Sequence, residues 1–137
     1  MKKVLLKTLV TIGLLAPVAL FANKKDLMVI VTTNDGVTQT MSIVLSSLAK
    51  KEGANVNVLF CGKAGDLVIK APKDSTPPMQ KWVVDKLIKK GTPVEICPPY
   101  LRANGKTKEE LIKGVKVAKP KMVAKKLLEK NTRILSY

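Results

Sequence analysis

Histidine is absent from this 137-residue chain, and aromatic residues make up only 4% of it. Without histidine, the chain cannot form a Ser/His/Asp triad, a His-paired cysteine or a His-rich metal site. The scarcity of aromatic side chains argues against a stacking platform for single-stranded nucleic acid. Cysteine occurs only at Cys61 and Cys97, which is too few for a disulfide scaffold. A cysteine thiolate is therefore the group that remains for covalent chemistry.

Acidic residues are also few, with 10 Asp and Glu against 25 Lys and Arg, and the formal net charge is +15. This balance suggests anionic partners such as envelope lipids, an acidic protein or a small anion, rather than nucleic acid. The lysines are spread along the chain, which is typical of a solvated basic surface. Asp35, Asp66 and Asp74 form no closely spaced carboxylate pair, and we expect neither a metal nor a cofactor.

The N-terminus has the pattern of a Sec-type signal peptide. It begins with basic residues, continues with an apolar stretch from Leu9 to Phe21 that Pro17 interrupts, and offers the small residue Ala22 for cleavage. The uninterrupted apolar length falls short of the roughly 20 residues that span a bilayer. We therefore expect residues 1–22 to be a signal peptide and 23–137 to be one domain. The mature protein is expected in the periplasm, without an integral membrane segment.

Strands and helices are predicted to alternate along residues 23–137. Apolar runs predict strands at residues 27–31, 56–61, 92–97, 115–117 and 133–137. Helical spacing and capping signals predict helices at 37–51, 79–90, 107–113 and 120–130. Such alternation with short connections predicts an α/β domain, in which a mainly parallel sheet of about five strands is covered on both faces.

Two of these helices carry specific expectations. In the first, apolar residues recur at helical spacing, at Met41, Val44, Leu45 and Leu48. The second is expected to start with Thr76 as N-cap and Pro77 as first helical residue. Its inward face is expected to carry Trp82, together with Val83, Leu87 and Ile88.

Candidate functional residues lie at the predicted carboxyl ends of the strands, where open parallel sheets bind ligands. Asn34 and Asp35 follow the first strand, Cys61 ends the second, and Cys97 ends the third. Both cysteines are therefore expected at the edge where function is found. The turn from Gly62 to Gly65 lacks the spacing of a phosphate-binding loop, although it suits a small anion.

Cys97 is the better candidate for a nucleophile. Pro98 and Pro99 follow it and have no backbone N–H to offer a thiolate, whereas Arg102 is expected to supply positive charge. Tyr100 either lines a pocket beside the thiol or packs in the core. Two alternatives remain open for Cys97: a buried strand-end cysteine, or half of a disulfide. Cys61 is either a core residue, a resolving thiol or the partner in that disulfide.

The chain resembles the DsrE/DsrF-like sulfur-relay proteins. The resemblance rests on a helix ending in Gly91, a strand ending in Cys97, Gly105, and a capped helix that closes on Gly114-Val115. The opening strand and the terminal residues 133–137 are also similar. The chain departs from the family pattern at Tyr100, where many members have a second cysteine, and at Asn104, where an arginine is usual.

This resemblance implies a three-layer α/β/α sandwich, a homo-oligomer, and a cysteine that carries sulfane sulfur as a persulfide between partner proteins. Cys97 stands at that position. The leading hypothesis is an exported sulfur carrier, or sulfurtransferase-like protein, in which Cys97 works as a single thiol. Its partners would be sulfur donor and acceptor proteins or small sulfane-sulfur compounds. The alternatives are a non-catalytic envelope module that binds a small anion or a protein, and a thiol–disulfide protein that uses Cys61 and Cys97.

Overall fold

A computed structural model describes residues 24–137 of the chain. The expected signal peptide therefore lies outside the described residues. In chain order the elements are β1 (Asp26–Val31), α1 (Gly36–Lys51), β2 (Asn55–Phe60), the 3-10 helix η1 (Gly62–Val68), α2 (Met79–Lys89), β3 (Val94–Ile96), α3 (Pro98–Ala103), the 3-10 turn η2 (Lys108–Glu110), β4 (Val115–Val117), α4 (Pro120–Leu127) and β5 (Thr132–Ser136).

The five strands form one sheet in the order β4-β3-β2-β1-β5, and every neighbouring pair is parallel. The central strands β1 and β2 are mainly apolar, and each buries at least half of its residues, as expected for strands that are covered on both faces. The prediction of a mainly parallel sheet with about five strands is confirmed. All five carboxyl ends consequently meet at one edge.

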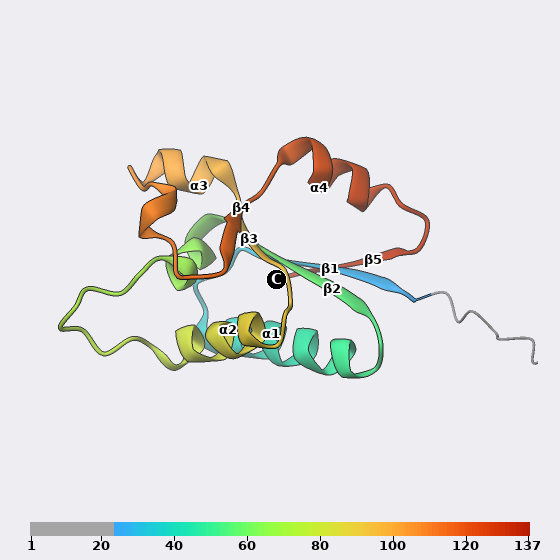
Figure 1. Cartoon of the computed structure of the whole chain (residues 1–137), viewed down its shortest axis with the longest axis horizontal. Coiled ribbons are helices and arrows are strands. Elements are labelled where there is room, and N and C mark those ends of the chain that lie inside the picture. Colours follow the sequence, from blue (N-terminus) through green and yellow to red (C-terminus); the bar gives the residue numbers. More distant parts are fainter. Residues whose placement is uncertain (1–23) are drawn as a thin grey trace, which may run out of the picture.

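Helices cover both faces of the sheet, so the predicted three-layer α/β/α arrangement is also confirmed. Figure 1 shows α1 and α2 on one side of the sheet and α3 and α4 on the other. The larger core cluster includes Ile43 of α1, Leu87 of α2 and Phe60 of β2. A smaller cluster of Met28, Leu59 and Ala118 lies on the α4 side, where Val123 and Leu127 pack against it. None of the helices in residues 24–137 is long and apolar enough to cross a membrane.

Helix α1 presents its polar residues to the protein interior and most of its large apolar residues to solvent. Gln39, Ser42 and Ser46 are buried beside Ile43. The serine hydroxyls donate to backbone carbonyls of the helix itself, each at 2.7 Å, so they are buried without losing hydrogen bonds. The exposed apolar side chains are Val37, Met41, Val44, Leu45 and Leu48. The helical spacing predicted this helix, but its apolar stripe faces outward.

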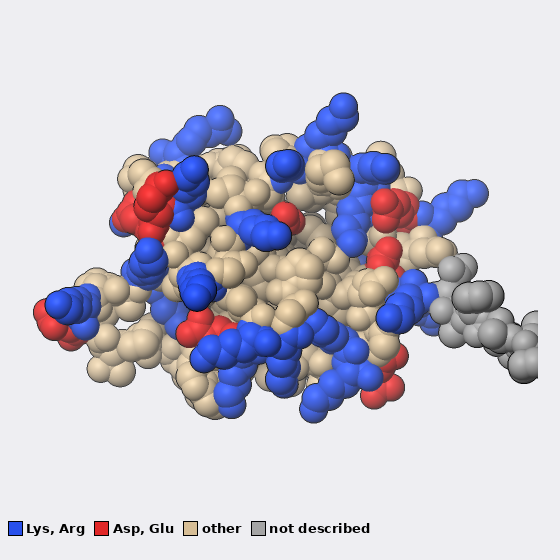
Figure 2. Space-filling model, viewed as in Figure 1, with Lys and Arg blue, Asp and Glu red and all other residues tan. Residues whose placement is uncertain are grey.

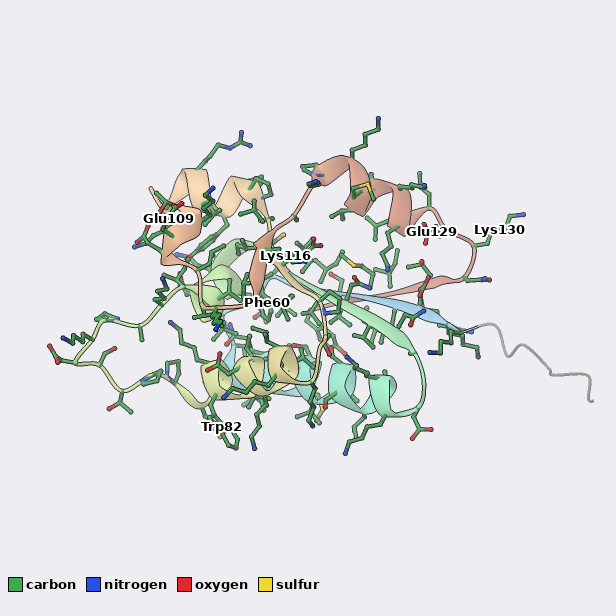
Figure 3. All side chains as sticks on the ribbon, in the orientation of Figure 1. Phe60, Trp82, Glu109, Lys116, Glu129 and Lys130 are labelled. Carbon is green, nitrogen blue, oxygen red and sulfur yellow. The ribbon has the colours of Figure 1, made fainter. Side chains whose placement is uncertain are left out.

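Helix α2 begins at Met79, as the predicted range 79–90 has it, but its N-cap differs from the prediction and its tryptophan points outward. Pro78, with extended backbone angles, is the N-cap residue, so the expected capping by Thr76 and Pro77 was wrong. The reason is that each residue before a proline is pushed away from the helical region, and Thr76 and Pro77 both precede one. Trp82 is 57% exposed, contrary to the expected inward face, and Lys86 lies 3.5 Å from its ring centre. Figure 3 shows Trp82 on the outer side of α2.

Candidate functional site

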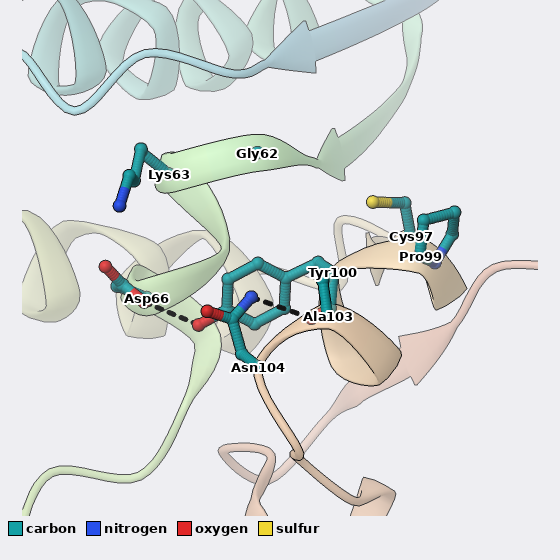
Figure 4. Close-up of a pocket in the computed structure, with 8 residues that line it drawn as sticks. All are labelled: Gly62, Lys63, Asp66, Cys97, Pro99, Tyr100, Ala103 and Asn104. Atoms are coloured by element: carbon teal, nitrogen blue, oxygen red, sulfur yellow. Dashed lines mark hydrogen bonds between the residues drawn. The ribbon is translucent and has the colours of Figure 1, made fainter.

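A pocket opens at the carboxyl edge of the sheet between η1 and α3 (Figure 4). Its volume is about 400 Å³. Its lining comes from the segments that follow β2 and β3: Gly62, Lys63, Asp66, Cys97, Pro99, Tyr100, Ala103 and Asn104. Of the residues predicted to be functional, Cys97 and Tyr100 lie in this lining. The pocket is therefore a site with a thiol on one wall.

Cys97 occupies the junction between β3 and α3. Its backbone is extended, and its N–H donates to the carbonyl of Phe60 at 3.0 Å. The next two residues are prolines, and the N–H of Tyr100 turns back to the carbonyl of Cys97 at 3.1 Å. The first turn of α3 therefore directs no free backbone N–H at the sulfur. In Figure 4 the sulfur points toward the ribbon at Gly62, away from the Pro99 ring. Any electrostatic help for a thiolate must come from outside the first turn of α3.

Lys63 is the cation in the pocket lining, and Arg102 is not part of that lining. Arg102 is exposed on α3. Its position does not support the expectation that it supplies positive charge beside the Cys97 thiol. Lys106, the other basic residue nearby, forms an ion pair with Glu110 at 2.9 Å. The sequence offered a signal for Lys63, because it lies in the Gly62–Gly65 turn that suits a small anion.

Tyr100 forms the buried floor of the pocket and is hydrogen-bonded to Asp66. The Tyr100 hydroxyl donates to Oδ1 of Asp66 at 2.5 Å. Burial, followed by this bond and the neighbouring negative charge, raises the pKa of Tyr100 well above its ordinary value. A Cβ at Gly65 would lie 2.4 Å from Cδ2 of the Tyr100 ring. Only glycine at position 65 lets the ring pack this closely against η1.

Asp66 and Asn104 are pocket residues that the sequence did not identify as functional. Asp66 lies 34 positions from Tyr100 in the chain, and no local pattern links the two. Asn104 donates from its side chain to the Tyr100 carbonyl at 2.8 Å, which fixes the end of α3. Both residues hold Tyr100 in place, and both expose polar atoms to whatever enters the pocket.

Cys61 lies next to Cys97, at the end of the neighbouring strand. The Cys61 N–H donates to the carbonyl of Val31 at 2.9 Å, which continues the pairing of β2 with β1. The two cysteines are unbridged thiols, and both are half-buried. Burial raises the pKa of the Cys61 thiol to about 12, with further contributions from a hydrogen bond to Cys97 and from the charge of Cys97. Cys61 therefore keeps its proton at neutral pH.

Asn34 and Asp35 are not part of the pocket that contains Cys97. Asp35 is the N-cap of α1: its Oδ2 accepts from the N–H of Thr38 at 2.7 Å, and this hydrogen bonding lowers the pKa of the carboxyl group. Asn34 is exposed in the same turn. Asp35 lines a separate hollow between the starts of α1 and α2. The structure thus gives Asp35 a capping role and separates both residues from the thiol.

The surface of the described residues is basic and contains few ion pairs. Figure 2 shows Lys and Arg side chains distributed over the visible face, with a smaller number of acidic groups among them. Within residues 24–137 the ion pairs are Lys106–Glu110 and Lys108–Glu109, so most lysines have no acidic partner. The described residues contain no cluster of three or more Cys, Asp or Glu that suits a metal ion.

The fold and the site together define a class: a three-layer α/β/α protein with a thiol-bearing pocket at the carboxyl edge of a five-stranded parallel sheet.

No protein-family model matches the chain, and no curated protein does. Solved structures do share its fold. The YchN protein from E. coli is similar with a TM-score of 0.68 and 17% identity over 83% of this chain and 99% of its own. MTH1491 from Methanobacterium thermoautotrophicum, a protein of unknown function, is similar with a TM-score of 0.64 and 16% identity over 84% of this chain and 100% of its own. At these identities the two likenesses show a shared fold.

Proposed function

We propose that this protein is a sulfur carrier of the DsrE/DsrF-like type, in which Cys97 accepts a sulfane sulfur as a persulfide and passes it to a partner. The observation that carries the proposal is the position of Cys97, a half-buried thiol on the wall of an open pocket at the carboxyl edge of the sheet. The chain has no histidine, so the chemistry must be that of a thiolate alone. Sulfur transfer meets this requirement because its nucleophile and its leaving group are both sulfur anions.

The transfer takes place in two displacements. The Cys97 thiolate attacks the sulfane sulfur of thiosulfate, a polysulfide or a protein persulfide. A bond forms between Sγ and that sulfur, the donor's own S–S bond breaks, and its electron pair leaves with the rest of the donor. A thiolate of the acceptor then attacks the terminal sulfur, which restores the Cys97 thiolate. No external oxidant or reductant is needed in either step.

The pocket supports this chemistry through charge and shape. Lys63 contributes a positive charge to the lining, and the small sulfane-sulfur donors are anions. Pro99 and Tyr100 offer apolar walls, and the Tyr100 hydroxyl is already bonded to Asp66. A polarizable sulfur chain suits such a mixed lining. Because the pocket is open to solvent on one side, a partner protein could also present its cysteine there.

Intact mass spectrometry of the two single-cysteine proteins tests the proposal. Reduced Cys61→Ser and Cys97→Ser proteins are exposed to inorganic polysulfide, and the excess is removed. We expect adducts of whole sulfur atoms on Cys61→Ser, which retains Cys97, and none on Cys97→Ser. Equal adducts on both proteins would show unselective thiol chemistry. No adduct on either would leave the alternative, a module that binds an anion in the same pocket without reacting.

The proposal includes export of the protein. The basic start, the apolar stretch and Ala22 form the pattern of a signal peptide over residues 1–22, and the single domain 23–137 would then act in the periplasm. Expression of the full chain in a bacterium with a periplasm should yield a fractionated mature protein whose first residue is Asn23. An intact N-terminus on cytoplasmic protein would contradict this part of the proposal.

The proposal also includes a homo-oligomer, in agreement with the family resemblance. The outward apolar stripe of α1 gives this a physical basis, because contiguous exposed apolar surface marks interaction sites. Met41 is 52% exposed in the stripe, and Met122 is 59% exposed on α4, across the sheet. Sedimentation velocity should show that Met41→Glu dissociates the assembly and that the matched change Met122→Glu does not. A wild-type monomer at all concentrations would contradict self-association.

A further inference from the structure

The two cysteines occupy matching positions on neighbouring strands. Phe60 of β2 is paired with Ile96 of β3, so Cys61 and Cys97 are the next pair in the same register. The Cys97 N–H still donates to the Phe60 carbonyl at 3.0 Å, which shows that the strands have not separated at this point. Paired strands lie about 4.8 Å apart, and a disulfide joins Cα atoms about 4.4–6.8 Å apart. The backbone therefore needs no rearrangement to bring the two sulfur atoms together.

Both thiols also lie on the same face of the sheet. Each packs against the small cluster of Met28, Leu59 and Ala118 under α4, as expected for residues that share a register position on parallel strands. Cys97 also contributes to the raised pKa of the Cys61 thiol, as expected of a neighbouring group. Register and side-chain direction thus agree in making the two residues a pair.

The two thiols nevertheless differ in access. Cys97 belongs to the lining of the pocket and Cys61 does not. A donor that enters the pocket meets Cys97 first, and Cys61 lies beside it on the neighbouring strand. This arrangement is that of an entry thiol with a second thiol next to it.

We propose that Cys61 is the resolving thiol of this site, which discharges the Cys97 persulfide internally when no acceptor removes the sulfur. This inference rests on the proposed function, because it needs a persulfide on Cys97. The Cys61 sulfur attacks Sγ of Cys97, and a Cys61–Cys97 disulfide forms. The bond from Sγ to the terminal sulfur breaks, and that sulfur leaves with its electron pair as hydrosulfide. The proton that Cys61 loses is taken up by the departing sulfur, so an anionic persulfide yields the disulfide and one hydrosulfide. The two cysteine sulfurs are oxidised and the sulfane sulfur is reduced, so no other oxidant takes part.

The pKa of Cys61 is expected to depend on whether Cys97 carries a persulfide. Burial raises the pKa of Cys61, and so do the hydrogen bond and the charge of Cys97. A persulfide carries its charge one sulfur further out, which weakens the last two effects and leaves burial in place. Cys61 is thus least reactive when Cys97 is empty and gains reactivity when Cys97 is loaded. Discharge should be slow at neutral pH, because attack requires the Cys61 thiolate and the raised pKa of Cys61 keeps that form scarce.

The experiment compares wild-type protein with Cys61→Ser after loading. Both proteins are reduced, treated with a limiting amount of inorganic polysulfide under anaerobic conditions, and desalted. Intact mass and released sulfide are then followed at several pH values. In the wild type we expect the adduct to decay to a species two hydrogens lighter than the reduced protein, with one sulfide released per disulfide. In Cys61→Ser the adduct should persist at least about ten times longer.

The outcomes separate this inference from the function on which it rests. Equal adduct lifetimes in both proteins, or loss of sulfide from the wild type without the lighter species, overturn the role of Cys61 and leave the carrier function intact. No adduct on Cys61→Ser overturns the carrier function itself and this inference with it. Cys61→Ala serves as a second variant, so that an effect of the serine hydroxyl is not mistaken for loss of the thiol.

Discussion

The ends of β2 and β3 are built alike and yet present their cysteines differently. Each strand ends at a cysteine that is the N-cap residue of a short helical segment, η1 after Cys61 and α3 after Cys97. After Cys61 the chain turns at Gly62, whose φ is +52°, and runs close to the Thr32 carbonyl. After Cys97 two prolines carry the chain outward into α3. The residues that follow each strand, rather than the strands themselves, decide which thiol opens on the pocket.

The largest effect is expected from a change in the contact between η1 and α3, the segments that follow the two strands. Gly65→Ala should place a Cβ 2.4 Å from the Tyr100 ring and force η1 and α3 apart. We expect a loss of about 2 kcal/mol in the free energy of unfolding, the typical cost of overpacking, measured by urea denaturation. The matched change Gly36→Ala meets only the flexible end of the Gln80 side chain, and should cost less than about 1 kcal/mol. Equal effects would mean that Tyr100 is not held against η1.

The difference in access predicts a difference in alkylation. In wild-type protein at pH 7.5, iodoacetamide should label Cys97 at least about ten times faster than Cys61, since only thiolates react. Because the pKa of Cys61 is raised to about 12, its labelling rate should continue to increase up to pH 10. Peptide mapping of timed samples measures both rates. Equal rates at pH 7.5, or a Cys61 rate that levels off near pH 9, would contradict the account.

Alkylation of Cys61 in the absence of the Cys97 thiol tests the interaction between the two thiols. Cys97→Ala takes away the hydrogen bond and the charge that help to raise the pKa of Cys61, and leaves the effect of burial. Cys61 should therefore be labelled faster in Cys97→Ala than in the wild type at the same pH. An unchanged Cys61 rate would show that the two thiols do not interact.

The smallest expected effect concerns the cation beside the thiol. Lys63→Gln should slow the loading of Cys97 by polysulfide about threefold at low salt, which is the scale of one exposed charge. The loss should shrink as ionic strength rises, because salt screens such attraction. The control is Arg102→Gln, whose side chain lies outside the pocket lining and should have little effect. A larger effect from Arg102 would restore the role that the sequence suggested for it.

The strands and the functional edge could be predicted from sequence because they depend on local patterns. Apolar runs marked the strands, and the capping box at Thr107 was found where the sequence placed it, with the Thr107 N–H donating to Glu110 at 2.9 Å. The inverted face of α1 could not be predicted, since apolar spacing locates a stripe but does not say whether the stripe faces the sheet or solvent. Small buried serines were the only hint.

The composition of the pocket was harder to predict than its position. Cys97 and Tyr100 lie close together in the chain and were found by their place at the strand end. Asp66 reaches Tyr100 only through the packing of η1 against α3, and the contact of Cys61 with Cys97 depends on the register of β2 with β3. Contacts between segments that are distant in the chain do not change the local spacing of apolar residues, so that spacing cannot predict them.

The central claim, that Cys97 is the thiol that takes up sulfane sulfur, is tested most directly by locating the sulfur in the wild-type protein. Reduced protein is mixed with polysulfide, quenched within seconds with iodoacetamide, and digested for peptide mapping. The account predicts that the peptide containing Cys97 carries an extra sulfur at the earliest times and that the peptide containing Cys61 does not. Extra sulfur that appears first on Cys61, or on neither peptide, would contradict it.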